Sequence, residues 1–67
     1  MPEFESLSFE EKRAVTVFEN MYNQQILRIK GEFNIVEFAK RMDRGYDVCN
    51  MLRNKIRPFI YHLTPEA

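Results

Sequence analysis

Two helix-start signals constrain the fold of this sequence more than any other feature. Ser8 precedes Glu11 by three residues, the spacing at which each side chain can bond the other's free backbone N–H group. Asn34 and Glu37 repeat this spacing farther along the chain. Apolar residues follow both signals at intervals of three and four, which is typical of a helix with one buried face. The sequence therefore predicts a mainly helical chain.

The first helix is predicted over residues 9–30. Phe18 and Tyr22 belong to its apolar stripe, and Gly31 supplies a residue that tolerates the left-handed conformation of a helix cap. Residues 26–35 also partly alternate between apolar and polar around a Lys-Gly pair, which is typical of a β-hairpin. We rank the hairpin second, because two strands alone are only marginally stable.

Two more helices complete the predicted fold, an all-α three-helix domain that spans the whole chain. One covers residues 35–44 and ends before Gly45, and the next covers residues 48–57 with Asp47 as its cap. Pro58 ends the last helix, because proline disfavours helical geometry in the residue before it. The segments that we expect to fray are residues 1–7 and 64–67.

Charge and cysteine content exclude several classes of protein. Ten Lys and Arg balance ten Asp and Glu, so the net charge gives no reason to expect nucleic acid or a membrane as the partner. No apolar run approaches the ~18 residues of a membrane span, and the acidic start does not resemble a secretory leader. The single cysteine cannot form an intramolecular disulfide. We therefore expect a cytoplasmic protein with no membrane partner.

The sequence offers little for catalysis or metal binding. Cys49 and His62 are the only soft metal ligands, whereas a metal site needs three or four ligands at suitable spacing. Neither glycine belongs to a phosphate-binding loop. Glu10 and Glu11 are explained as charges that offset the dipole of the first helix. We therefore expect no enzyme, no catalytic residue, no cofactor, no metal and no small-molecule substrate.

Apolar residues exceed what so short a chain can bury. A domain of this size buries only about 60% of the surface of its extended chain, yet apolar residues make up 45% of the sequence. Large apolar groups left on a surface mark an interface. Whether residues 59–63 pack on their own core or on a partner stays open. The candidate apolar interface residues are Phe4, Phe9, Phe59, Ile60 and Tyr61.

Cations gather in the second half of the chain. Residues 40–57 contain six Lys and Arg but only two acids, whereas residues 1–11 contain four acids and no base. Such a cluster can neutralise the phosphates of a nucleic acid and release their counterions. The alternative interpretation is a helix face that is simply solvated.

Residues 35–54 resemble the helix-turn-helix of DNA-binding proteins. The family needs a small residue where its two helices cross, with apolar residues around it and a buried pair in the second helix. The matching residues are Phe38, Ala39, Met42, Cys49 and Leu52. Where the family usually has glycine directly after the position of Met42, this chain has Asp43, and Gly45 comes two residues later.

This resemblance implies that residues 48–57 form a recognition helix that enters the major groove. Asn and Arg suit that position, because each can make paired hydrogen bonds to a base edge. The residues that it places near base edges are Tyr46, Asn50, Arg53 and Asn54. Those that it places on backbone phosphates are Lys40, Arg41, Arg44, Lys55 and Arg57. The chain also resembles, more weakly, a ribbon-helix-helix, in which a strand at residues 27–29 would pair with the same strand of a second chain.

Two functions follow, in order of preference. The first is a small intracellular helical module that binds another protein, either an adaptor or inhibitor that docks on a larger protein or a homodimer. Neutral charge and surplus apolar residues favour it without any motif. The alternative is a helix-turn-helix DNA-binding regulator of transcription, whose partner is double-stranded DNA.

Overall fold

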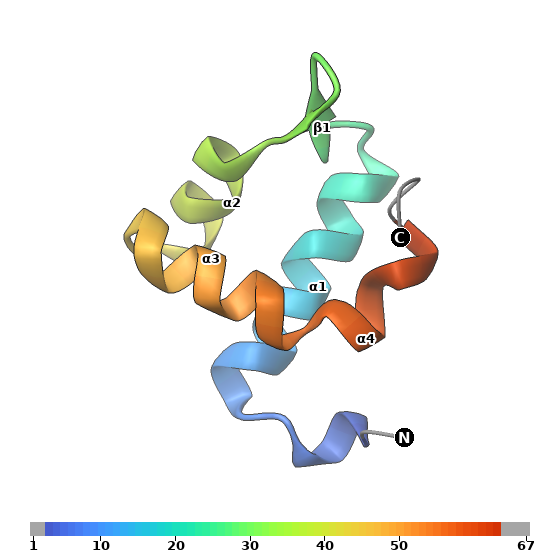
Figure 1. Cartoon of the computed structure of the whole chain (residues 1–67), viewed down its shortest axis with the longest axis vertical. Helices are drawn as coiled ribbons and strands as arrows, with labels where there is room; N and C mark the ends of the chain where they lie inside the picture. Colours follow the sequence, from blue (N-terminus) through green and yellow to red (C-terminus); the bar gives the residue numbers. More distant parts are fainter. Residues whose placement is uncertain (1–2, 64–67) are drawn as a thin grey trace.

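The capping signal at Ser8 starts the longest helix of the computed structural model, which describes residues 3–63 (Figure 1). The Ser8 side chain accepts a hydrogen bond from the backbone N–H of Glu11 at 3.1 Å, and the backbone N–H of Ser8 donates to the Glu11 carboxylate at 2.8 Å. The elements in chain order are a 3₁₀ helix (Phe4–Ser6), α1 (Phe9–Asn23), β1 (Arg28–Ile29), β2 (Glu32–Phe33), α2 (Ile35–Met42), α3 (Tyr46–Lys55), α4 (Arg57–Ile60) and a second 3₁₀ helix (Tyr61–Leu63).

The prediction of a mainly helical chain is confirmed, but the count of three helices is not exact. Within residues 3–63 there are four α-helices and a small two-stranded sheet. Residues 4–6, which were expected to fray, form a turn of 3₁₀ helix. The expected fraying of residues 1–2 and 64–67 concerns positions outside the described range.

The first helix stops seven residues before the predicted end, at Asn23 rather than residue 30. Gln25 adopts a left-handed backbone conformation with φ of 61°. The N–H of Ile26 then donates to the carbonyl of Met21 at 3.0 Å, which satisfies a carbonyl in the last helical turn. The prediction was wrong because it assigned the left-handed cap to a glycine, and here glutamine occupies it.

The hairpin ranked second for residues 26–35 is the structure that forms. Its strands β1 and β2 are antiparallel, and the two residues between them, Lys30 and Gly31, have φ of 53° and 80°. Positive φ at both positions is the geometry whose twist suits a two-residue hairpin turn. The paired residues are Arg28 with Phe33 and Ile29 with Glu32. Within the chain, β1 therefore pairs with β2, whereas the second resemblance would pair it with the same strand of a second chain.

Three aromatic rings explain why so short a hairpin is stable. Phe33 of β2 stacks on Phe18 of α1 with ring centroids 5.5 Å apart, and it meets Phe38 of α2 edge-on at 5.4 Å. Offset and edge-on pairs add to the stabilisation from burial. The Asn34 side chain donates to the carbonyl of Ile26 at 3.0 Å, which ties the base of the hairpin together. Tertiary packing therefore supplies what two strands alone lack.

A tight turn separates α2 from α3. Asp43 follows α2 in the left-handed region, with φ of 57° and ψ of 48°, and the N–H of Arg44 donates to the carbonyl of Ala39 at 3.2 Å. α3 then begins at Tyr46, two residues earlier than predicted, and ends at Lys55. Asp47 is not its cap, because Gly45 precedes the helix and no side chain caps it.

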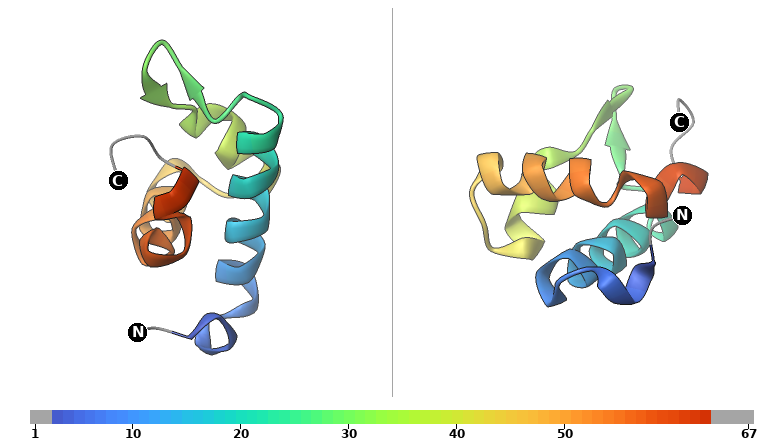
Figure 2. Two further views of the ribbon diagram at one scale, coloured as in Figure 1. Left: turned by 90° about the vertical axis from the view of Figure 1, so that its right-hand side faces the viewer. Right: turned by 60° about the horizontal axis from the view of Figure 1, so that its bottom comes forward.

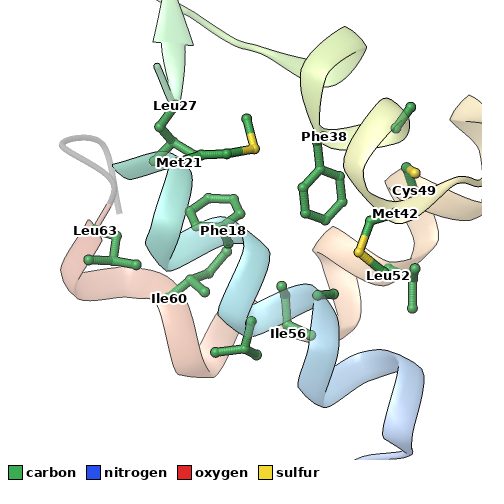
Figure 3. Close-up of a cluster of buried hydrophobic side chains, with 13 residues drawn as sticks. Phe18, Met21, Leu27, Phe38, Met42, Cys49, Leu52, Ile56, Ile60 and Leu63 are labelled. Atoms are coloured by element: carbon green, nitrogen blue, oxygen red, sulfur yellow. The ribbon is translucent and has the colours of Figure 1, made fainter. Parts of the chain in front are cut away.

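The core lies between α1, α2 and the layer that α3 and α4 form along one side of α1 (Figure 2). Figure 3 shows Phe18 of α1 and Phe38 of α2 at its centre, with Met42 and Ile56 beside them. Ile60 and Leu63 close the other end, so residues 59–63 pack on their own core. Cys49 is fully buried, as predicted.

None of the helices within residues 3–63 combines the length and the apolar character needed to cross a bilayer.

Candidate functional site

An open groove of about 550 Å³ lies between the β-hairpin and α3. Both strands contribute to one wall, and one face of α3 forms the other. The lining residues are Arg28, Gly31, Glu32, Phe33, Ile35, Tyr46, Asn50 and Arg53. The groove is open at the surface, and the tip of the hairpin stands clear of the helices (Figure 1).

Helical spacing places three predicted contact residues together in this groove. Tyr46, Asn50 and Arg53 are four and three residues apart, so they share one face of α3. Cys49 and Leu52 of the same helix are buried in the core and fix its orientation. The face with the three polar side chains therefore lies beside the buried side of α3, with Tyr46 and Asn50 exposed and Arg53 partly buried.

Arg53 is anchored by an aromatic ring of the hairpin. Its guanidinium carbon lies 4.5 Å from the ring centroid of Phe33, which is a cation–π contact. Phe33 stacks in turn on Phe18 of the core. The side chain of Arg53 is thus held against the groove wall before anything binds, and less conformational entropy remains to be lost on binding.

The cations around the groove repel one another. Partial burial lowers the pKa of Arg53 below its usual value, and the positive charges of Arg57 and Arg28 lower it further. Within residues 3–63, no carboxylate forms an ion pair with Arg53 or Arg57. Arg57 instead donates to the amide oxygen of Asn54 at 3.1 Å. An anion that enters the groove would relieve this repulsion.

One acidic residue reduces the positive electrostatic potential of the groove. Glu32 of β2 lies in its lining together with Arg28 and Arg53. The lining therefore carries two positive charges and one negative charge. Arg28 also donates a hydrogen bond to the carbonyl of Gly31, so its side chain lies over the hairpin turn.

Two predicted phosphate contacts are engaged elsewhere. Arg41 donates to Glu37 at 2.9 Å and to the side chain of Gln24 at 2.7 Å, and Arg44 pairs with Glu10 of α1 at 2.7 Å. The contacts of Arg41 with Gln24 and of Arg44 with Glu10 join α2 and the turn to α1, whereas the Arg41–Glu37 pair lies within α2. The predicted contacts that do not line the groove are Lys40, Arg41, Arg44, Asn54, Lys55 and Arg57.

The predicted apolar interface does not form one exposed surface. Ile60 is only 3% exposed, so it belongs to the core and not to an exposed face. Phe4 and Phe59 pack edge-on, with ring centroids 5.9 Å apart, and partly cover each other. Phe9 and Tyr61 remain exposed, at 84% and 54%.

Sequence reasoning missed Arg28 and Phe33 as site residues. Both belong to the hairpin, and the alternating pattern around Lys30-Gly31 was the signal that could have found them. That pattern gives the pairing of the strands, but it cannot show that Phe33 reaches the guanidinium of Arg53.

Among the remaining groups, Cys49 is buried in the core. Burial raises the pKa of the Cys49 thiol, which keeps it protonated and unreactive. In the part of the chain that the structure describes, no three His, Cys, Asp or Glu side chains gather as metal ligands. No protein-family model, curated protein or solved structure matches this chain. Its function is therefore inferred from the groove.

Proposed function

We propose that the protein binds duplex DNA through the exposed face of α3, as a small regulator of transcription. One observation carries this proposal: Tyr46, Asn50 and Arg53 share a face of α3 beside the hairpin residue Arg28. Hydrogen-bonding side chains next to cations are what a DNA-binding surface needs, because phosphate contacts position the protein and base contacts give specificity.

The turn between α2 and α3 supports the proposal. In helix-turn-helix proteins a glycine usually follows the first helix, where the chain needs a left-handed residue. Asp43 takes that conformation here, with φ of 57°, and aspartate tolerates it better than most residues. The departure from the family's sequence pattern therefore does not prevent the family's turn. Ala39, the small residue that the resemblance requires in the first helix, is buried in α2.

The dimensions and exposure of α3 also fit the role. Ten residues make a helix about 15 Å long, and the major groove of B-DNA is about 12 Å wide and admits a helix. Asn50 is exposed in the middle of α3. An asparagine there can donate to and accept from one adenine edge.

Salt-dependent binding tests this function. Fluorescence anisotropy with a short duplex of random sequence should give measurable affinity at about 50 mM salt and a steep loss towards about 200 mM. The logarithm of the affinity should fall by about 0.9 for each phosphate neutralised per unit of the logarithm of salt concentration. An unmodified protein that binds no duplex at low salt would overturn the proposal.

Asn50 provides the test of base recognition. With a duplex selected for tight binding, Asn50→Ala should lose about 1–3 kcal/mol of preference over random duplex while keeping its salt dependence. Asn20→Ala is the matched control, because Asn20 is an exposed asparagine of α1 outside the groove. Equal losses in both variants would argue against base contact by α3.

A protein partner is the second candidate function. Phe9 is 84% exposed at the start of α1, and Met51 is 61% exposed on α3. Exposed aromatic and Met side chains are enriched at interface centres. If this candidate is correct, sedimentation equilibrium should detect self-association or capture by a purified partner, and Phe9→Ser should weaken it. If the protein stays monomeric at every accessible concentration and also binds DNA, the protein-partner candidate has no support.

A further inference from the structure

If α3 alone contacted DNA, the wall of the groove that the β-hairpin forms would take no part in binding. Arg28 comes from β1 and Arg53 from α3, yet both line the same groove. They are separated by the whole of α2 in the sequence. A single group bound in the groove would therefore touch two elements of the fold.

Charge and shape favour a phosphate as that group. Guanidinium groups have planar forks of N–H donors that match phosphate oxygens, and here they come from opposite walls. Arg28 and Arg53 both line the groove, so it offers two positive charges to an anion against the single negative charge of Glu32. A phosphodiester brings one negative charge and acceptor oxygens, so it can satisfy both walls.

The groove is also formed in advance. Phe33 holds Arg53 by the cation–π contact and is itself fixed by Phe18 and Phe38. Arg28 is bonded to the carbonyl of Gly31 across the hairpin turn. The two guanidinium groups are therefore positioned by the fold and need little ordering when they bind.

From these observations we infer that the groove holds one backbone phosphate of the bound DNA between Arg28 and Arg53. The β-hairpin is then a second contact element, and it sets the register of α3 on the duplex. This inference rests on the proposed function and adds to it: Asn50 touches a base, whereas Arg53 touches the backbone. Glu32 limits the affinity, because its charge lies in the same lining.

A double-mutant cycle tests the shared phosphate. Arg28→Gln and Arg53→Gln should each weaken duplex binding about tenfold, the loss of one charge-assisted contact. If both hold the same phosphate, the double variant should also lose about tenfold, whereas two independent contacts would lose about a hundredfold. Lys12→Gln is the control, because Lys12 lies over the Phe4 ring and outside the groove. Its affinity should stay within about twofold, the effect expected of a distant charge.

Glu32→Gln gives a test of opposite sign. Removing the acid from the groove should tighten duplex binding severalfold and leave the fold unchanged, as measured by circular dichroism. Unchanged or weaker binding in this variant would contradict a phosphate beside Glu32.

Nuclear magnetic resonance of the arginine Nε–H groups reports on the groove directly. Titration with inorganic phosphate at constant ionic strength, and separately with duplex DNA, should shift the Arg28 and Arg53 signals together. The Arg44 signal should stay fixed, because Arg44 is paired with Glu10. Duplex binding that shifts the Asn50 signals but neither groove arginine would overturn the inference and leave the proposed function standing. Absence of any duplex binding would overturn both. A glutamate peptide that shifts both signals when phosphate does not would assign the groove to an acidic protein segment instead.

Discussion

The arginines of this protein divide between two regions with opposite surroundings. At the junction of α1 with α2 and the following turn, Arg44 pairs with Glu10 of α1, and Arg41 donates to Gln24 beside the end of α1 while it pairs with Glu37 of its own helix. Arg13 donates to the carbonyls of Arg41 and Met42 at the end of α2, at 3.0 and 3.4 Å. Around the groove, Arg53 lies on an aromatic ring and is repelled by neighbouring arginines.

This contrast separates cations that hold the fold from cations that face the groove. The junction pairs place the turn, and so the start of α3, against α1. The cations around the groove repel one another, so they do not stabilise the fold through contacts with one another. An excess of Lys and Arg in residues 40–57 does not distinguish these cases, because both regions draw on the same segment.

The ring that joins the groove to the core should give the largest effect. Phe33→Ala removes a partly buried ring that packs on Phe18 and Phe38, so we expect the free energy of unfolding to fall by about 2–4 kcal/mol. Urea denaturation measures this fall. Phe9→Ala, at an 84% exposed position, should change stability by less than about 0.5 kcal/mol. Equal losses would mean that the hairpin is not tied to the core.

The hairpin turn and the turn between α2 and α3 each contain a residue with a left-handed backbone. Substitutions of these residues should have smaller effects on stability. Gly31→Ala places a side chain at φ of 80° in the hairpin turn and should cost about 1 kcal/mol. Asp43→Gly relieves a left-handed residue at the junction turn and should be neutral or stabilising by up to about 1 kcal/mol. Thermal unfolding of both variants checks the signs. A stabilising Gly31→Ala would refute the assigned hairpin turn.

The ion pair of the junction should have a modest effect on stability and none on DNA binding. Arg44→Gln removes the pair with Glu10, which is partly exposed, so we expect a loss of about 0.5 kcal/mol. Arg53→Gln should show the reverse pattern, with a larger effect on duplex affinity than on stability. Chemical denaturation and anisotropy on the same two samples give the comparison. If both variants lose affinity equally, the division between the regions is wrong.

The smallest expected effect is a pH dependence from Glu37, which pairs with Arg41 one turn along α2. The hydrogen bond from Arg41 holds the pKa of Glu37 below its usual value. A carboxyl with a lowered folded pKa stabilises the fold above its unfolded pKa, about 4.3, and this contribution disappears as the pH falls through the folded value. Denaturation at a series of acidic pH values should show this loss, and Glu37→Gln should remove it. Glu19→Gln in α1 is the matched control, and this variant should still lose stability as the pH falls.

Local signals predicted much of the helical part of the fold. The capping pairs at Ser8 and Asn34 mark the true starts of α1 and α2, because the atoms that form these caps lie within three residues of each other. The buried pair Cys49 and Leu52 was predicted by its spacing on α3. Helix ends were harder, since Gln25 rather than glycine takes the left-handed cap of α1.

The candidate site was predicted only on its α3 side. Helical spacing was enough to put Tyr46, Asn50 and Arg53 on one face. The partner wall depends on the hairpin, which two isolated strands could not sustain. Phe33 stabilises that hairpin by packing on Phe18, a residue from a different element. The choice between helix and hairpin was therefore made by a contact that local patterns do not encode.

The sequence by itself determined where α1 and α2 begin and which of their faces are buried, because caps and apolar periodicity act over a single turn. Only the tertiary structure decided which cations stabilise the fold and which face the groove. Coulomb interactions and ring contacts depend on distances between residues far apart in the chain, and packing around Phe18 sets those distances.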